Sequence, residues 1–111
     1  MNISDRVRLL HMLDAAQEAI LFCQGRSRAD LDDDRMLVLA LMKAIEIIGE
    51  AANQITETTR KQYPLIPWTD IVGMRNRLVH AYFDINLDIL WQTIQHDLPP
   101  LVMELQRALQ E

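Results

Sequence analysis

The residues of this chain that best fit a chemical role lie together in the segment 75–82. Arg75, His80 and Tyr82 place a permanent cation, an imidazole and a phenol within eight residues. Arginine stays charged at any working pH, and its planar guanidinium matches the shape of a phosphate. A histidine with an ordinary pKa of about 6.5 both accepts and donates protons near neutral pH. Arg75 and His80 together therefore have the chemistry to cleave RNA without a metal ion.

The reaction that this pair supports is an internal attack on the RNA backbone. His80 would act as a base toward the ribose 2′-hydroxyl or as an acid toward the departing 5′-oxygen. Arg75 would stabilise the charge on the phosphorane, and the product would be a 2′,3′-cyclic phosphate. Asn76 would orient the guanidinium or the histidine, or would donate a hydrogen bond to phosphate. A dimer would supply two histidines, so that the acid and the base come from different subunits.

The spacing of Arg75 and His80 does not by itself place them at one site. Five residues correspond to about 140° around a regular helix, so the two side chains do not share a face. They converge if the histidine lies in the last helical turn and the long arginine reaches around into the same groove. In the alternative interpretation, Arg75 is a surface residue and His80 neutralises a helix C-terminus. Spacing alone leaves both interpretations open.

The composition predicts one helical domain, residues 1–111. The chain has 111 residues, of which 50% are hydrophobic and 5% aromatic, and this length supports one core. Leu, Ile, Ala and Met dominate the apolar residues, which favours packed helices over sheets. The net charge of −5 argues against a protein that coats nucleic acid by bulk electrostatics. It does not exclude a small arginine-lined cleft that binds RNA locally.

The sequence predicts neither a metal nor a cofactor. Cys23 is the single cysteine, which excludes an internal disulfide, and we expect it to be a buried, inert thiol. The aspartates at positions 30 and 32–34 are interpreted as acids at a helix start, because the ordered ligands and turn glycine of a cation loop are missing. No apolar run is long enough for a membrane span or a signal peptide. We therefore expect a soluble, cytoplasmic protein without a membrane partner.

The spacing of apolar residues predicts an all-α fold. Four main helices are expected at about 4–23, 33–60, 68–81 and 87–95, and a last helix follows an interruption at 97–100 and ends near residue 109. Ser4 is the expected N-cap of the first helix, and Gly25 is expected to stop it. Asp84 or Asn86 should cap the fourth. Short connections make an antiparallel four-helix bundle with an additional short C-terminal helix the expected architecture.

The predicted helix 33–60 carries two features that bear on assembly and on a site. Residues 36–42 are apolar nearly all round, which indicates contacts on several sides and favours dimerisation. Gly49, with small residues nearby, is expected to permit the close approach of another helix. Glu50 and Asn53 are three residues apart and share a face. They are either solvent-exposed or line a polar cleft.

Several sequence blocks occur together in a recognisable order. They are IIGEAA at 47–52, PW at 67–68, VGMRNRLVHAYF at 72–83 and LW at 90–91. In this order they resemble the HepT-like branch of the HEPN superfamily, and the resemblance covers nearly the whole chain. The signature R-x4-H-x-Y of that branch is matched by Arg75, His80 and Tyr82, and the polar residue that often follows the arginine is matched by Asn76.

The resemblance implies a helical-bundle ribonuclease toxin of a type VII toxin-antitoxin system. Such a toxin works as a homodimer and is paired, in some cases as a larger hetero-oligomer, with an MntA-like nucleotidyltransferase antitoxin. It implies that Arg75 and His80 are the catalytic pair and that Tyr82 accepts the AMP groups that silence the toxin. Asn76 and Glu50 are expected to support the pair.

Two other classes of protein remain as alternatives. One is a non-catalytic HEPN module that binds substrate or presents it to a nucleotidyltransferase, and the other is a bare structural bundle. Toxicity on expression of the chain alone fits only the nuclease. His11 and His96 are distant from the motif in sequence and are expected to be surface residues.

Overall fold

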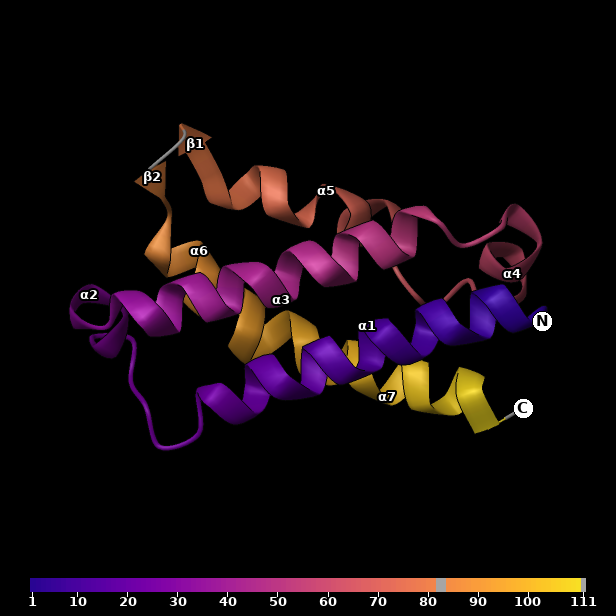
Figure 1. The fold of residues 1–111 in the computed structure, drawn as a ribbon, viewed down its shortest axis with the longest axis horizontal. Helices are drawn as coiled ribbons and strands as arrows, with labels where there is room; N and C mark the ends of the chain where they lie inside the picture. Colours follow the sequence, from indigo (N-terminus) through magenta and orange to yellow (C-terminus); the bar gives the residue numbers. More distant parts are fainter. Residues whose placement is uncertain (82–83, 111) are drawn as a thin grey trace.

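The computed structural model describes residues 1–81 and 84–110, and within them it is helical apart from one short hairpin (Figure 1). The elements are α1 (Ile3–Phe22), α2 (Asp30–Asp33), α3 (Arg35–Asn53), α4 (Glu57–Gln62), α5 (Trp68–Leu78), β1 (Val79–Ala81), β2 (Asp84–Ile85), α6 (Leu87–Gln92), a π-helical segment (Thr93–Asp97) and α7 (Leu98–Gln110). The expected all-α bundle is confirmed. None of these described helices is both long and apolar enough to span a membrane.

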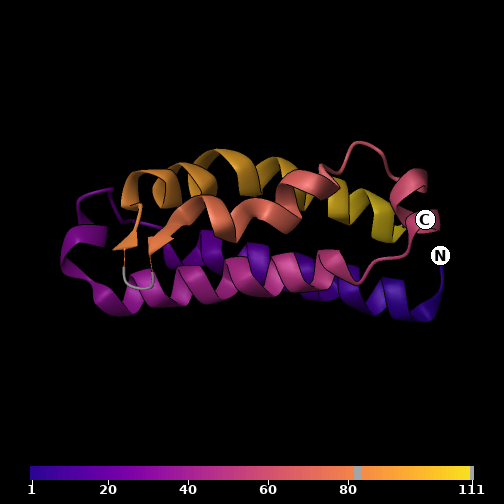
Figure 2. The ribbon, with the colours of Figure 1, turned by 90° about the horizontal axis from the view of Figure 1, so that it is seen from above.

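The long helices lie in two layers. α1 packs against α3 and α7, and α3 packs against α5 on its other side. Figure 2 shows α1 and α3 below, with α5 and the run from α6 to α7 above them. The core between the layers consists of side chains without measurable exposure, among them Leu9, Met12, Leu41, Ile45, Ile48, Leu78, Leu90, Leu98 and Leu105. α3 is thus the central helix, and it brings its polar edge next to α5.

The first helix begins earlier than the sequence predicts. Its N-cap is Asn2, whose side-chain oxygen accepts a hydrogen bond from the Asp5 amide at 2.7 Å. The expectation that Ser4 is the cap was wrong. The Asn2 side chain already accepts from the backbone N–H of Asp5, and asparagine caps a helix as well as serine does. Gly25 follows the helix with φ at 72°, the left-handed conformation that glycine was expected to supply.

The predicted helix 33–60 is two helices, and this expectation was also wrong. α3 ends at Asn53, and α4 starts anew at Glu57 behind the N-cap Thr56. The Arg60 guanidinium folds back and donates to the carbonyls of Ala52 at 2.8 Å and Ile55 at 3.2 Å. The arginine therefore satisfies carbonyls at and just beyond the end of α3, where a continuing helix would otherwise have paired them.

A buried carboxylate joins this turn to the start of α1. Asp5, which is 1% exposed, accepts hydrogen bonds from the Thr56 amide at 3.2 Å, the Thr56 hydroxyl at 2.5 Å and the Thr59 hydroxyl at 2.6 Å. Burial by itself would raise the pKa of Asp5, but the hydrogen bonds from Thr56 and Thr59 outweigh burial and lower the pKa below its ordinary value. Asp5 thereby fixes α4 against the N-terminal end of the bundle.

The predicted helix 68–81 stops three residues early. α5 ends at Leu78, and β1 pairs in antiparallel register with β2, Val79 opposite Ile85 and Ala81 opposite Asp84. The Asn86 amide donates to the Leu78 carbonyl at 2.7 Å and closes the base of this hairpin. His80 therefore lies on a strand, and its expected place in a last helical turn was wrong. The β-branched Val79 at the junction suits an extended backbone.

The C-terminal third is more continuous than expected. Asn86 caps α6 by accepting from the Ile89 amide at 3.0 Å, as predicted, whereas Asp84 belongs to β2. The expected interruption at 97–100 was wrong, because a π-helical segment (Thr93–Asp97) leads directly into α7, which begins at Leu98. Pro99 and Pro100 lie in the first turn of α7, where an absent amide hydrogen costs little. The last helix is longer than predicted and packs against α1.

Candidate active site

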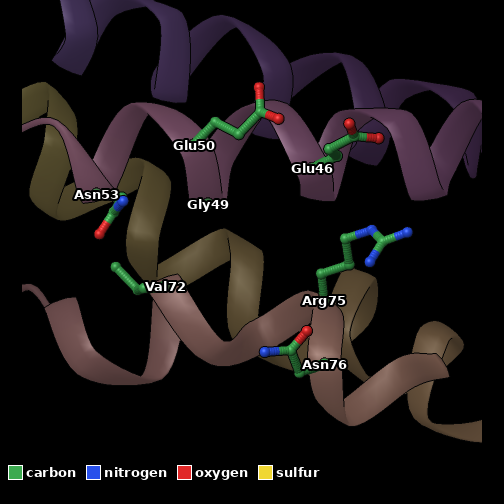
Figure 3. A pocket seen from close by; sticks show the side chains of 7 residues that line it. All are labelled: Glu46, Gly49, Glu50, Asn53, Val72, Arg75 and Asn76. Atoms are coloured by element: carbon green, nitrogen blue, oxygen red, sulfur yellow. The ribbon is translucent and has the colours of Figure 1, made fainter. Parts of the chain in front are cut away.

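A cleft of about 290 Å³ lies between α3 and α5 and holds most of the polar residues that the sequence singled out (Figure 3). Four lining residues come from α3 and three from α5: Glu46, Gly49, Glu50, Asn53, Val72, Arg75 and Asn76. The two helices run alongside each other, so one polar edge of each forms a wall. The cleft is open to solvent because its charged and amide side chains are partly or fully exposed.

Gly49 lies where the two walls approach each other closely. A Cβ atom built on Gly49 would lie 3.5 Å from the Ile71 carbonyl oxygen and 3.9 Å from that of Val72. These are ordinary contact distances, so a methyl group fits there but a larger side chain would enter the cleft or push α5 away. The close helix approach predicted at Gly49 is confirmed.

Arg75 is the cationic group of this cleft. Figure 3 shows its side chain extending from α5 toward Glu46 on α3, with the Asn76 amide next to it along α5. Within residues 1–81 and 84–110, Arg75 forms no ion pair, and Glu46 is 3.9 Å from the ammonium of Lys43. An exposed guanidinium without a carboxylate partner is available to a phosphate.

Glu50 and Asn53 satisfy both interpretations that the sequence left open. Both side chains are exposed, and both line the cleft. Figure 3 shows the Asn53 amide on the side of Val72 and the Glu50 carboxylate directed away from α5. Asn53 therefore offers hydrogen-bonding atoms to the cleft, whereas the charge of Glu50 lies at its outer edge.

The sequence motif is only partly covered by the described side chains. Arg75 and Asn76 lie in the last turn of α5, and the backbone of His80 belongs to β1. The His80 side chain and all of Tyr82 fall outside the described residues. His11 and His96 are exposed, as predicted. Glu46 and Val72 were missed by the sequence reading because only the packing of α3 on α5 brings them to the cleft.

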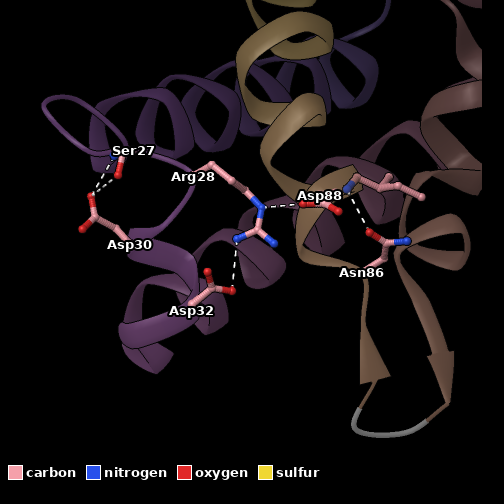
Figure 4. Close-up of polar contacts among 7 residues, drawn as sticks. Ser27, Arg28, Asp30, Asp32, Asn86 and Asp88 are labelled. Atoms are coloured by element: carbon pink, nitrogen blue, oxygen red, sulfur yellow. Dashed lines mark hydrogen bonds and ion pairs between the residues drawn. The ribbon is translucent and has the colours of Figure 1, made fainter.

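The aspartates before α3 stabilise local structure (Figure 4). Asp30 accepts from the Ser27 amide at 2.7 Å, and Asp34 caps α3. Arg28 forms ion pairs with Asp32 at 3.2 Å and with Asp88 at 2.7 Å. In the portion of the chain that the structure describes, no three histidine, cysteine or acidic side chains gather in a way that could hold a metal ion.

Comparison with known proteins identifies the family. Residues 12–108 match the model of the ribonuclease HepT-like family. The chain belongs to the ribonuclease HepT-like family. The match spans every helix from within α1 to within α7, so it includes both walls of the cleft.

Relatives of this HepT-like chain cover most of its length. An inferred RNase from Caldanaerobacter subterraneus subsp. tengcongensis is 35% identical over 106 residues, which are 96% of this chain and 95% of that protein. An inferred RNase from Methanocaldococcus jannaschii is 34% identical over 98 residues, 88% of this chain and 90% of that protein. An inferred ribonuclease HepT from Thermococcus cleftensis is 40% identical over 68 residues, 61% of this chain and 62% of that protein. No solved structure matches the chain significantly.

In this HepT-like chain, Arg75 and His80 are held by different elements, α5 and β1. Arg75 projects from a helix whose inner side is buried through Ile71, Met74 and Leu78. His80 follows on a strand whose base is closed by the hydrogen bond between Asn86 and Leu78. The helix therefore fixes the arginine against α3, and the hairpin fixes the backbone that carries the histidine.

Proposed function

We propose that this chain is the ribonuclease toxin of a type VII toxin-antitoxin system and that Arg75 and His80 cleave RNA without a metal ion. The observation that carries the proposal is the solvent-open cleft in which Arg75 has no ion-pair partner among the described residues. His80 follows five residues later on the adjoining strand. Membership of the ribonuclease HepT-like family supports RNA as the substrate.

In the proposed reaction the RNA backbone attacks itself. A histidine removes the proton of the ribose 2′-hydroxyl, the 2′-oxygen bonds to phosphorus, and the bond from phosphorus to the 5′-oxygen breaks. The departing 5′-oxygen takes a proton from a second imidazole, which leaves a 2′,3′-cyclic phosphate and a 5′-hydroxyl. Arg75 stabilises the phosphorane, in which negative charge is greatest. Asn76 donates to a phosphate oxygen, and Glu50 supports the site from the edge of the cleft.

The alternative is a HEPN module that binds substrate for a nucleotidyltransferase without catalysis. Both proteins would be found with a small nucleotidyltransferase, so partner identity does not separate them. Expression of the chain alone separates them, because the nuclease stops growth and fragments RNA whereas the module does neither. The same experiment with His80→Ala tests whether any toxicity depends on the proposed proton-transfer group.

The proposed active unit is a cytoplasmic homodimer with α3 and α5 at its interface. α3 exposes Met36 by 83% and Leu39 by 49%, and Phe22 at the end of α1 is 39% exposed. Met36 and Phe22 line one cleft, which Arg26 and Asp34 also border, so exposed apolar side chains of α1 and α3 meet there. Burying these side chains against a second copy would be favourable by roughly 25 cal/mol per Å². A two-fold axis would also bring two histidines to one composite cleft.

Light scattering should give about twice the chain mass of 12.9 kDa at micromolar concentration. Leu39→Lys should shift the protein toward the monomer, because it places a charge in the apolar surface. Leu65→Lys is the matched control, since Leu65 is 70% exposed but lies in the turn before α5. A wild-type protein that stays monomeric under these conditions would remove the dimer and the composite cleft with it.

The proposed control of the toxin is the addition of AMP to Tyr82 by an MntA-like nucleotidyltransferase antitoxin, within a larger hetero-oligomer. Tyr82 lies two residues beyond His80 in sequence. Each AMP brings a phosphodiester charge and a base, so the modified residue would compete with RNA for the anion site that Arg75 provides. Modification would therefore block substrate rather than unfold the protein.

Tyr82→Phe is expected to abolish AMP addition while the chain stays folded, because the change removes the acceptor oxygen and keeps the ring. Mass spectrometry after co-expression with the nucleotidyltransferase measures the result, and Tyr63→Phe is the control. Wild type and Tyr63→Phe should both gain AMP-sized mass increments. Increments that persist in Tyr82→Phe, or that map to another residue, would show that Tyr82 is not the acceptor.

A further inference from the structure

We propose that a second cleft, between α1 and α3, binds the RNA strand next to the phosphate that is cleaved. This inference rests on the proposed ribonuclease function and extends it to a substrate-binding subsite. The cleft has a volume of about 340 Å³. Its lining residues come from α1, from α3 and from the C-cap of α3: Val7, Arg8, His11, Ile47, Glu50, Ala51 and Gln54.

The two clefts adjoin each other at Glu50. This residue lines the Arg75 cleft on one side of α3 and the second cleft on the other. Figure 3 shows the Glu50 carboxylate directed away from α5, which is the side on which α1 lies in Figure 1. A ligand longer than one nucleotide can therefore cross α3 at Glu50 and contact both clefts.

The second cleft presents hydrogen-bond donors suited to phosphate. Arg8 and His11 are three residues apart on α1 and so lie on one face. In the part of the chain that the structure describes, the Arg8 guanidinium donates to two neutral oxygens, the Ser4 carbonyl at 3.4 Å and the Gln54 side-chain oxygen at 3.3 Å. These hydrogen bonds are long and weak, so a phosphate oxygen would replace them readily.

The described arginines fall into two groups, those with an ion-pair partner and those, Arg8 among them, without one. Arg26, Arg28 and Arg107 each form an ion pair with an acidic side chain, but Arg8 forms none within the described residues. The charge of Arg8 contributes to lowering the pKa of Asp5, yet that carboxylate is buried and already accepts from Thr56 and Thr59. Arg8 and Arg75 are thus cations without acidic partners that line two adjoining clefts of an acidic protein.

The position of Glu50 determines how a strand would lie. Its negative charge repels phosphate from the ridge between the clefts, so successive phosphates would lie on either side, near Arg75 and near Arg8. The nucleoside between them would lie over Glu50, where the carboxylate can accept from a 2′-hydroxyl or an exocyclic amine. A flexible single strand can take this path, and the site should therefore favour single-stranded RNA.

The subsite is tested by RNA binding in the His80→Ala background, in which cleavage does not interfere. The probe is a fluorescently labelled oligouridylate long enough to reach both clefts, measured by anisotropy at several salt concentrations. Adding Arg8→Gln and His11→Asn should weaken binding about tenfold at low salt. The slope of log affinity against log salt should fall by about 0.7 for each lost phosphate contact.

The matched control is Arg6→Gln, which removes an exposed arginine of α1 outside this cleft. It should change affinity less than twofold, and Arg8→Lys should retain the salt slope. Equal binding by the Arg8→Gln, His11→Asn protein and the Arg6→Gln protein would overturn the subsite while leaving the ribonuclease proposal intact. If the His80→Ala parent does not bind RNA and the wild-type protein does not cleave it, the ribonuclease proposal fails and the subsite fails with it.

Discussion

Replacing either Arg75 or His80 by alanine is expected to lower the rate of RNA cleavage by roughly 10²–10⁴-fold. His80→Ala removes a proton-transfer group, and Arg75→Ala removes the cation that stabilises the phosphorane. Arg75 is exposed and forms no ion pair within the described part of the chain, so its loss should not disturb folding. The measurement is the initial rate of cleavage of an oligoribonucleotide in EDTA, with detection of the 2′,3′-cyclic phosphate.

Arg77→Ala is the control for these variants. Arg77 is also exposed in the last turn of α5, but it lines a different cleft, together with Asp70 and His96. Its rate should stay within about twofold of wild type. Wild-type rates in Arg75→Ala or His80→Ala would remove the catalytic assignment, and loss of activity in EDTA would remove metal independence.

Replacing Asp5 by alanine is expected to lower the free energy of unfolding by about 2–4 kcal/mol. The change leaves the Thr56 amide and the hydroxyls of Thr56 and Thr59 without their carboxylate acceptor, and Thr59 is only 2% exposed. Urea unfolding, followed by circular dichroism, measures the effect. Asp14→Ala on the exposed side of α1 should change stability by no more than about 0.5 kcal/mol. An Asp5→Ala protein as stable as Asp14→Ala would contradict the role given to this carboxylate.

The contribution of Asp5 should also depend on pH. The pKa of Asp5 in the folded protein lies below its ordinary value of 3.8, so the unfolded chain binds a proton more readily than the folded one. The stabilisation is therefore fully present above that ordinary value and is lost as the pH falls through the lowered pKa. The stability difference between wild type and Asp5→Asn should be constant near neutral pH and should shrink at pH values below about 4. A difference that does not change in acid would exclude this linkage.

The presence and the buried faces of the long helices were predictable because they depend on local periodicity. The apolar spacing placed α1, α3 and α5, and the cap of α6 followed from Asn86. Their ends were less predictable. The connection between α3 and α4, residues 54–56, contains no glycine or proline. Only the contacts of Thr56 with Asp5 and of Arg60 with the end of α3 explain the turn.

The β1–β2 hairpin and the continuous helical path from α6 to α7 could not be predicted from the sequence for a similar reason. Residues near Val79 continue a helical pattern, and the change to a strand depends on pairing with Ile85. Pro99 and Pro100 signal a break, yet proline in a first helical turn is compatible with a chain that remains helical through a π segment. Both outcomes depend on partners or geometry that local residue preferences do not contain.

The residues of the candidate site also fall into a predictable group and an unpredictable group. Arg75, Asn76 and Glu50 were named from residue type and motif, and they line one cleft. Glu46 and Val72 were missed, as was the second cleft that contains Arg8 and His11. A motif identifies residues near each other in sequence, whereas these positions become neighbours only when α3 lies between α1 and α5.

Gly49 contributes backbone but no side chain to the cleft. The spacing of α3 and α5 and the polar groups of the cleft therefore depend on different residues. Position 49 controls the space between the helices but carries no group that could take part in proton transfer or bind phosphate. A single methyl group there would contact the Ile71 carbonyl oxygen of α5 and leave Arg75 and Asn76 in place. The spacing of α3 and α5 can therefore be changed at a position that lies in the same cleft as Arg75 while every polar side chain of that cleft is kept.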